Sequence, residues 1–165
     1  MDIFRALRAL PLFEAFDEAE LTTLAGLAKV RNFPSGAVLM SQGDFGTSMF
    51  VVTAGKARVT LHAPGGPKEI ALLGPGEMAG EISLLTGATR TATVTAVGRL
   101  EAIEIDKATF GTIVAMRKPI LERIAAVIEQ RRAELGRVRQ DAQAWRTGGF
   151  GYQELVAKMT QHYGR

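Results

Sequence analysis

The residues best suited to chemistry lie in one short segment that begins with a glycine and ends in a strand-like run. The segment reads Gly80-Glu81-Ile82-Ser83-Leu84-Leu85-Thr86-Gly87-Ala88-Thr89-Arg90-Thr91-Ala92-Thr93. A short helix is predicted from Glu81 to Thr86, and the first turn of a helix presents unpaired N–H groups that suit an anion. Arg90 adds a permanent charge whose planar fork matches phosphate oxygens, and Thr91 adds a hydroxyl beside it. These residues therefore predict an anion site that favours phosphate.

Glu81 narrows the kind of ligand that would fit. A carboxylate at a cationic site would repel a lone phosphate, whereas a ligand bearing both a phosphate and a hydroxyl would use it as an acceptor. The residues alone thus indicate a sugar phosphate or a nucleotide. Plain structural roles are the alternatives: Arg90 could bridge to a strand carboxylate, Glu81 could favour the helix dipole, and Thr91 could simply suit a strand.

Short strands must carry this segment, because the chain around it is rich in glycine. Eleven of the 18 glycines lie between Gly36 and Gly98, and they separate short runs of apolar and β-branched residues. Such runs are typical of an antiparallel barrel or sandwich. The predicted strands are residues 37–40, 49–53, 57–62, 69–73, 91–96 and 100–105, with a hairpin loop at 63–67.

Helices are predicted on both sides of these strands. Before them, Asp17 is a predicted N-cap with Glu20 as its capping-box partner. After them, a helix over 107–116 is followed by a long helix that begins at Pro119. A short final helix over 152–162 follows a glycine break.

Composition excludes several classes of function. The 165 residues contain no cysteine and only two histidines, His62 and His162, which excludes a disulfide framework, a thiol nucleophile and a cysteine-based zinc site. No nucleophile–base set or paired carboxylates indicate an enzyme, and no metal or cofactor is predicted. No run approaches the roughly 18 apolar residues of a membrane span, and the N-terminus reads as an amphipathic helix, so a cytoplasmic protein is expected.

Positive charge is concentrated near the C-terminus. The formal net charge is +3, yet residues 1–116 carry −2 and residues 117–165 carry +5. The arginines of the long helix and its extension, such as Arg132 and Arg137, predict a solvated face or a surface for a partner or an anionic membrane. The stretch after residue 140 has no helix-turn-helix pattern, so nucleic-acid binding is not predicted.

The glycine-to-arginine segment resembles the phosphate-binding cassette of the cyclic-nucleotide-binding domain family. That cassette has a Gly-Glu, a short helix, and an Arg followed by a small or hydroxyl residue and Ala, matched here by Gly80-Glu81 and Arg90-Thr91-Ala92. A second family pattern lies upstream, as Gly43-Asp44, Phe50-Val51-Val52 and Gly55. The resemblance extends from about Leu10 to Leu135. One position departs from it, because the aromatic that usually precedes the Gly-Glu is Ala79 here, which removes a packing contact.

This resemblance implies an α+β, mainly β fold: an antiparallel β-roll or jelly-roll barrel flanked by N-terminal and C-terminal helices, including a long lid helix. Residues 1–140 would form the cyclic-nucleotide-binding domain, with a helical start (1–28), a roll (29–106) and lid helices (107–140). Residues 141–165 would form a basic tail with a short helix.

The resemblance also implies a role for each matching residue. Arg90 would pair with oxygens of the cyclic phosphate, and Glu81 would accept from the ribose 2′-hydroxyl. Backbone N–H groups and one hydroxyl would complete the phosphate cradle, from Gly80, Ile82, Ser83, Thr91 and Ala92. An apolar wall and the lid helix would enclose the base, through Val59, Leu61, Leu72, Val127, Gln130 and Arg131.

The implied function is a non-catalytic cyclic-nucleotide sensor. The favoured ligand is cAMP, and cGMP is the alternative, since a Thr after the arginine can also reach a guanine amino group. Ligand binding would shift the C-terminal helices and so regulate an attached or partner effector, such as an ion channel at the cytoplasmic side of a membrane. The helical ends would also offer a surface for oligomer formation. The alternatives are a degenerate β-roll that serves as an interaction scaffold and a truncated DNA-binding regulator.

Overall fold

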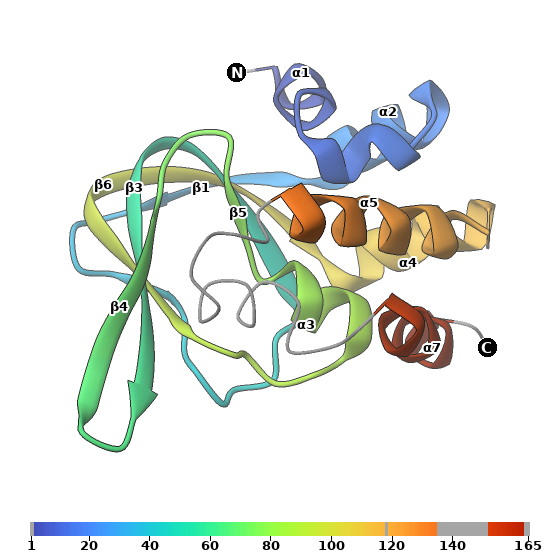
Figure 1. Cartoon of the computed structure of the whole chain (residues 1–165). Coiled ribbons are helices and arrows are strands. Elements are labelled where there is room, and N and C mark those ends of the chain that lie inside the picture. Colours follow the sequence, from blue (N-terminus) through green and yellow to red (C-terminus); the bar gives the residue numbers. More distant parts are fainter. Residues whose placement is uncertain (1, 118, 135–151, 164–165) are drawn as a thin grey trace.

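The computed structural model describes residues 2–117, 119–134 and 152–163. Its strands form a roll on one side, and its helices gather on the other (Figure 1). The helices are α1 (Ile3–Arg8), the 3₁₀ helix η1 (Pro11–Ala15), α2 (Glu18–Leu27), α3 (Glu81–Thr86), α4 (Lys107–Met116), α5 (Ile120–Glu134) and α7 (Tyr152–Tyr163). The strands are β1 (Lys29–Phe33), β2 (Val38–Met40), β3 (Ser48–Ala63), β4 (Gly66–Leu73), β5 (Met78–Ala79) and β6 (Thr93–Asp106). The predicted fold class, a β-roll with flanking helices, is confirmed.

The sheet is antiparallel throughout, in the order β1-β6-β3-β4, with β2 paired to β6 and β5 paired to β3. Each of the long strands β3 and β6 joins two of the predicted short strands. Gly55 and Gly98, which the sequence suggests as strand breaks, lie inside them with positive φ angles of 86° and 73°. Beside Gly55 the register shifts, so these glycines allow an irregularity in a continuous strand instead of ending it.

The edge strand β1 is not predicted from the sequence. Its first four residues are exposed and mostly polar, and only Phe33 is buried, so no alternation reveals it. The predicted hairpin, in contrast, is confirmed, although its loop is shorter than the predicted 63–67. Strands β3 and β4 pair as far as Ala63 and Gly66, so only residues 64 and 65 form the turn. The turn takes a positive φ of 105° at Gly65, which suits glycine.

Two hydrophobic cores lie on the two faces of β3. Met49 and Val51 point to the helices and join the larger core, while Phe50 and Val52 point into the roll and join the smaller one. This alternation is the ordinary two-residue period of a strand. It places the roll interior and the helical layer back to back, so a site at the start of β3 can contact both.

An ion pair ties the N-terminal helices to the junction of α4 and α5. The predicted capping box is confirmed, because the Glu20 N–H donates to Asp17 Oδ1 and the Asp17 N–H donates to Glu20 Oε1, both at 2.8 Å. The buried Glu20 carboxylate also accepts from Arg117 Nε at 3.0 Å and Nη2 at 2.8 Å. The hydrogen bond from Arg117 is the main reason why the pKa of Glu20 is lowered.

The C-terminal helix α7 returns to the body of the domain and packs against α3 and α5 (Figure 1). Its presence confirms the short helix predicted over 152–162. The glycine break predicted before residue 152 lies outside the described residues, as does Arg137 of the expected basic face. No helix in the described part of the chain is long and apolar enough to cross a membrane.

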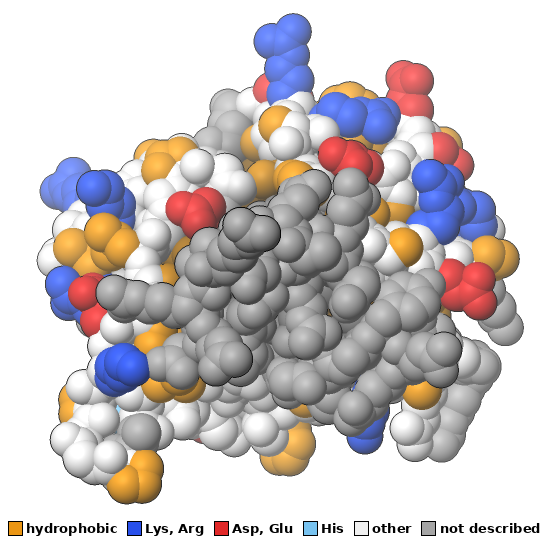
Figure 2. All heavy atoms as spheres, viewed as in Figure 1, with side chains coloured by type: hydrophobic (Ala, Val, Ile, Leu, Met, Phe, Trp, Pro, Cys, Tyr) orange, Lys and Arg blue, Asp and Glu red, His pale blue; other side chains and the backbone are white. Residues whose placement is uncertain are grey.

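Charged side chains are dispersed on the face of the molecule seen in Figure 2. Lys and Arg side chains alternate with Asp and Glu around its edge, so the described residues form no patch of a single sign there. The described residues also contain no group of three or more His, Asp and Glu side chains placed to hold a metal ion.

Candidate functional site

The centre of the candidate site is Arg90, a residue that is only 6% exposed. Its Nη2 donates to the Ser48 carbonyl at 2.6 Å, and its Nη1 donates to the Gly80 carbonyl at 3.2 Å. These two carbonyls belong to the start of β3 and to the residue before α3. Charge-assisted hydrogen bonds of this kind are strong and directional. The two bonds therefore fix the cation at the place where the roll meets the short helix.

Two glycines make room for this cation. A Cβ on Gly46 would lie 2.2 Å from Arg90 Cζ, and a Cβ on Gly80 would lie 2.5 Å from Arg90 Nη1. Real carbon atoms do not approach so closely, so any larger residue at either position would displace the guanidinium. Gly80 has a second reason to be glycine, since its φ of +88° lies in the left-handed region.

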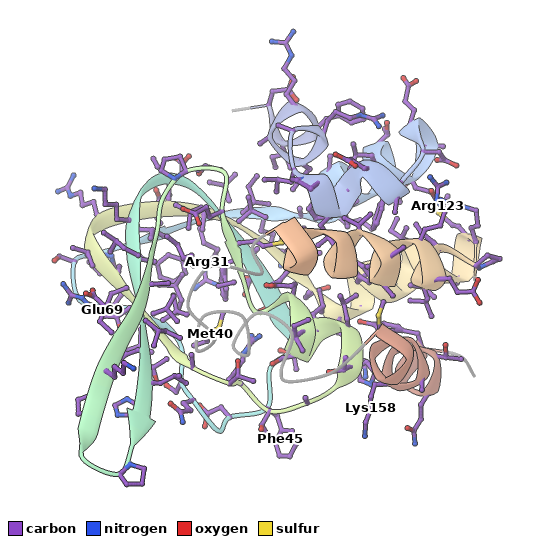
Figure 3. All side chains as sticks on the ribbon, in the orientation of Figure 1. Arg31, Met40, Phe45, Glu69, Arg123 and Lys158 are labelled. Carbon is purple, nitrogen blue, oxygen red and sulfur yellow. The ribbon has the colours of Figure 1, made fainter. Side chains whose placement is uncertain are left out.

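The loop before β3 also holds the backbone of Arg90. The Arg90 N–H donates to the Asp44 carbonyl at 2.7 Å, and the Gly43 N–H donates to the Arg90 carbonyl at 2.8 Å. Phe45 forms an isolated β-bridge with Thr89 beside these bonds, while its side chain is 82% exposed and projects outward (Figure 3). The upstream Gly-Asp pattern thus has a direct structural role: it fixes the main chain of the arginine.

Burial and nearby carboxylates act on Arg90 in opposite directions. Removal from water lowers the pKa of Arg90, whereas the negative charges of Glu81, Asp44 and Glu104 raise it. Glu81 is itself 7% exposed. A desolvated cation interacts more strongly with an added anion than an exposed one does, because the local dielectric is low. The site can therefore hold an anionic group against Arg90, with the Glu81 carboxylate in the same pocket.

Helix α3 supplies the other wall of the site. It starts at Gly80 without a side-chain cap, and the Gly80 carbonyl accepts from both the Leu84 N–H, at 3.1 Å, and Arg90. Six of the predicted cassette residues line one pocket together with Met40: Gly80, Glu81, Ile82, Ser83, Arg90 and Thr91. The side chain of Ala92 lies just beyond it, in the core of the roll.

The residues predicted to face the base are only partly brought together. Val59 is fully buried in the core of the roll, and Leu61 packs against that core. Leu72 lies elsewhere, with 47% of its surface exposed. The reason is strand alternation: Leu72 pairs with Arg58 on the outer face, and Ala71 stands opposite Val59.

The predicted lid residues lie on α5. Val127 is half-buried there, while the side chains of Gln130 and Arg131 lie outside the described residues. The first turns of α5 bury Ile120 and Ile124 in the helical core, and the helix packs against η1 and α7. The approach of the lid helix to a base therefore stays a prediction.

Sequence reasoning missed the residues that shape the site from a distance. Gly46 leaves space for Arg90, the Ser48 carbonyl accepts a hydrogen bond from it, and Met40 lines the pocket. The residue types at these three positions form no motif that would have identified them. The structure also compensates for the missing aromatic at Ala79. Ala79 stands opposite Phe50, whose ring meets Phe33 edge to face at 5.8 Å, so aromatic bulk reaches this place from β3 and β1.

The chain matches the family model described as the cyclic nucleotide-binding domain over residues 30–117. It therefore belongs to the cyclic nucleotide-binding domain family. The match includes the strands from β2 to β6, the helix α3 and the segments between them, and these carry every residue of the pocket described above.

Its relatives are regulatory proteins with different outputs. The cyclic AMP receptor protein of Thermus thermophilus is 30% identical over 125 residues, which cover 75% of this chain and 58% of that protein. A cyclic nucleotide-gated potassium channel of Rhizobium etli is 32% identical over 124 residues, which cover 75% of this chain and 34% of the channel. The solved regulatory domain of Toxoplasma gondii PKA with cAMP is similar with a TM-score of 0.68 and 25% identity, covering 86% of this chain and 54% of that one. The chain thus spans less than two thirds of the length of each of these relatives.

Proposed function

We propose that this domain is a non-catalytic sensor of a cyclic nucleotide, with cAMP as its ligand and cGMP as the alternative. The observation that carries the proposal is the buried guanidinium of Arg90 in one pocket with Glu81, at the start of α3. A cation and a carboxylate acceptor side by side suit a ligand that combines a phosphate with a free hydroxyl.

The parts of the ligand divide among the pocket residues. Arg90 pairs with the oxygens of the cyclic phosphate, and Glu81 accepts from the ribose 2′-hydroxyl. Backbone N–H groups and a hydroxyl complete the cradle, from Ile82, Ser83, Thr91 and Ala92. The N–H groups of a first helical turn have no acceptor within the helix, so they are suited to the phosphate.

The base lies against the roll in this proposal. Val59 and Leu61 form the apolar wall, while the outward position of Leu72 removes it from that role. A residue of α5 closes over the base, with Val127, Gln130 and Arg131 as the candidates. Two or three charge-assisted hydrogen bonds that form only in the closed state, at about 1.5–3 kcal/mol each, are enough for a nearly complete switch.

The preference for cAMP rests on two supports. Relatives whose names include cyclic AMP cover most of this chain, and a structurally similar regulatory domain was solved with cAMP. Thr91 beside Arg90 keeps cGMP as the alternative, because its hydroxyl can reach the amino group of a guanine.

The output passes through the C-terminal helices to an attached or partner effector, such as an ion channel. The support is the similarity to a cyclic nucleotide-gated potassium channel, together with the packing of α7 against the pocket helix α3. A DNA-binding effector is the competing output, since one of the similar solved structures is the N-terminal domain of a transcriptional regulator from Streptomyces coelicolor. Mobility shifts with mixed double-stranded DNA, with and without cAMP, separate the two, and we expect no shift.

A double-mutant cycle tests the proposed site. Calorimetry compares cAMP with 2′-deoxy-cAMP on the natural chain and on Glu81→Gln. We expect the natural chain to prefer cAMP by about tenfold, and Glu81→Gln to lose most of that preference, because one hydrogen bond to a charged group is removed on either side. An unchanged preference in Glu81→Gln would contradict the role of this carboxylate, and no binding of cAMP or cGMP by the natural chain would contradict the proposed function.

A further inference from the structure

The far end of α3 is covered by α7, the last described helix. The two helices lie side by side (Figure 1). Met159 of α7 is fully buried in the helical core, and the ring of Tyr163 lies 5.9 Å from the ring of Phe110. The contact is therefore a packed junction that joins α7 to α3 and α4, and α7 is more than a loose tail.

Polar contacts make this junction specific for the end of α3. The Tyr163 hydroxyl donates to the Leu84 carbonyl, which belongs to the last turn of α3. The last carbonyls of a helix lack partners within it, so Tyr163 acts as a distant cap. Burial raises the pKa of Tyr163, so the hydroxyl keeps the proton that it donates.

A glycine fits the two helices together. Gly87 ends α3 with a φ of +75°, and a Cβ there would lie 2.8 Å from the imidazole atoms Cε1 and Nδ1 of His162. The imidazole thus lies directly against the glycine that terminates the short helix. Tyr163 and His162 together close the end of α3 opposite to Arg90.

We infer that Tyr163 is a positioning residue of the ligand site, acting through α3. The inference rests on the proposed function. With six residues, α3 is too short to be stable by itself, so contacts at both of its ends must hold it. A phosphate at its start and the Tyr163 hydroxyl at its end satisfy orphan groups of the same helix. Each contact orders α3, and the other contact requires an ordered α3, so ligand binding and the docking of α7 favour one another.

This coupling gives α7 a role in the output. By thermodynamic reciprocity, whatever α7 contributes to ligand affinity, the ligand contributes to the docking of α7. An effector connected to α7 would then sense occupancy at Arg90 through the intervening helix α3. The expected sign is positive: ligand tightens the docking of α7, and loss of α7 weakens the ligand.

The test uses the full chain with Tyr163→Phe, which keeps the ring and removes the hydroxyl. Thr160→Val is the matched control, since it removes a hydroxyl from an exposed position of the same helix. Calorimetry with cAMP should give about threefold to tenfold weaker binding for Tyr163→Phe and no change for Thr160→Val. Hydrogen exchange should show that cAMP slows the amides of α7 in the natural chain, an effect that a merely structural role of Tyr163 would not produce.

The ligand-free proteins keep this inference separate from the proposed function. Tyr163→Phe should speed exchange at the α3 amides even without ligand, while Thr160→Val should not. If no cyclic nucleotide binds to the natural chain but the α3 amides still exchange faster in Tyr163→Phe, the contact between Tyr163 and α3 is supported and the proposed function is contradicted. Tight binding of cAMP by the natural chain, with affinity and α3 exchange both unchanged in Tyr163→Phe, would overturn the inference.

Discussion

The two ends of α3 are held in different ways. At its start, Arg90 is held within the roll and its loops. Its guanidinium donates to the backbone carbonyls of Ser48 and Gly80, and two glycines leave room for it. At its end, a side chain 79 residues further along the chain caps the Leu84 carbonyl. The anion-binding end is therefore built into the roll and its loops, whereas the other end is capped by a helix from a distant part of the sequence. In the coupling proposed above, the ligand site is the fixed end of α3, and the cap from α7 is its releasable end.

The largest effect is expected at the fixed end, from Gly46→Ala. A Cβ there overlaps the Arg90 guanidinium, which must leave its position. We expect the affinity for cAMP to fall about 100-fold, which corresponds to the loss of a charge-assisted contact worth about 3 kcal/mol. Gly74→Ala is the control, because a Cβ at Gly74 meets nothing within 4 Å. Equal affinities of Gly46→Ala and Gly74→Ala for cAMP would contradict the claim that Gly46 makes room for the anion-binding guanidinium.

A smaller effect is expected at the releasable end, from Gly87→Ala compared with Gly98→Ala. Both glycines have positive φ, at 75° and 73°, so alanine strains the backbone equally in the two variants. Only at Gly87 would the new Cβ also meet His162. We expect Gly87→Ala alone to weaken cAMP binding, by about tenfold if α7 is undocked. Urea unfolding of both variants measures the shared strain, and equal cAMP affinities would argue against coupling through α7.

The smallest effect is a dependence of α7 docking on pH. Burial, and then the nearby Lys107, lower the pKa of His162, so the docked state favours the neutral imidazole. A lowered pKa in the folded state means that this contribution is present above the unfolded value of about 6.5 and is lost as the pH falls through the lower folded value. Amide NMR signals of Leu84 and Gly87 should therefore shift on acidification from neutral pH. If His162→Gln shows the same shift of these amide signals with pH, a titrating group other than His162 causes it and the prediction is wrong.

The sequence predicts the fixed end of α3 better than the releasable end, and the reason is locality. Gly80, Glu81 and Arg90 lie in one continuous segment, so their types and spacing are enough to define a candidate site. Tyr163 and His162 meet α3 only through tertiary packing, and nothing in their type or spacing announces a contact with Leu84 or Gly87.

The same distinction between local signals and tertiary packing explains which parts of the roll the sequence predicts. The predicted hairpin follows from local turn chemistry, whereas the edge strand β1 is hidden because four of its five residues are exposed. The family resemblance assigns Leu72 to the base wall, yet the face of a residue depends on strand register, which the sequence does not specify. Gly46 escapes notice because its role is the space that it leaves for a distant side chain.

The most direct test of the central claim is a calorimetric titration with cAMP of the natural chain, Arg90→Ala and Arg99→Ala. Arg99→Ala removes the same charge from an exposed position of β6, and circular dichroism establishes that all three proteins are folded. We predict micromolar or tighter binding by the natural chain and by Arg99→Ala, and about 100-fold weaker binding by Arg90→Ala, as for Gly46→Ala, because both variants lose the same charge-assisted contact. Equal affinities for cAMP in all three proteins, or no binding by any of them, would contradict the assignment of Arg90 as the anion-binding centre of a cyclic-nucleotide sensor.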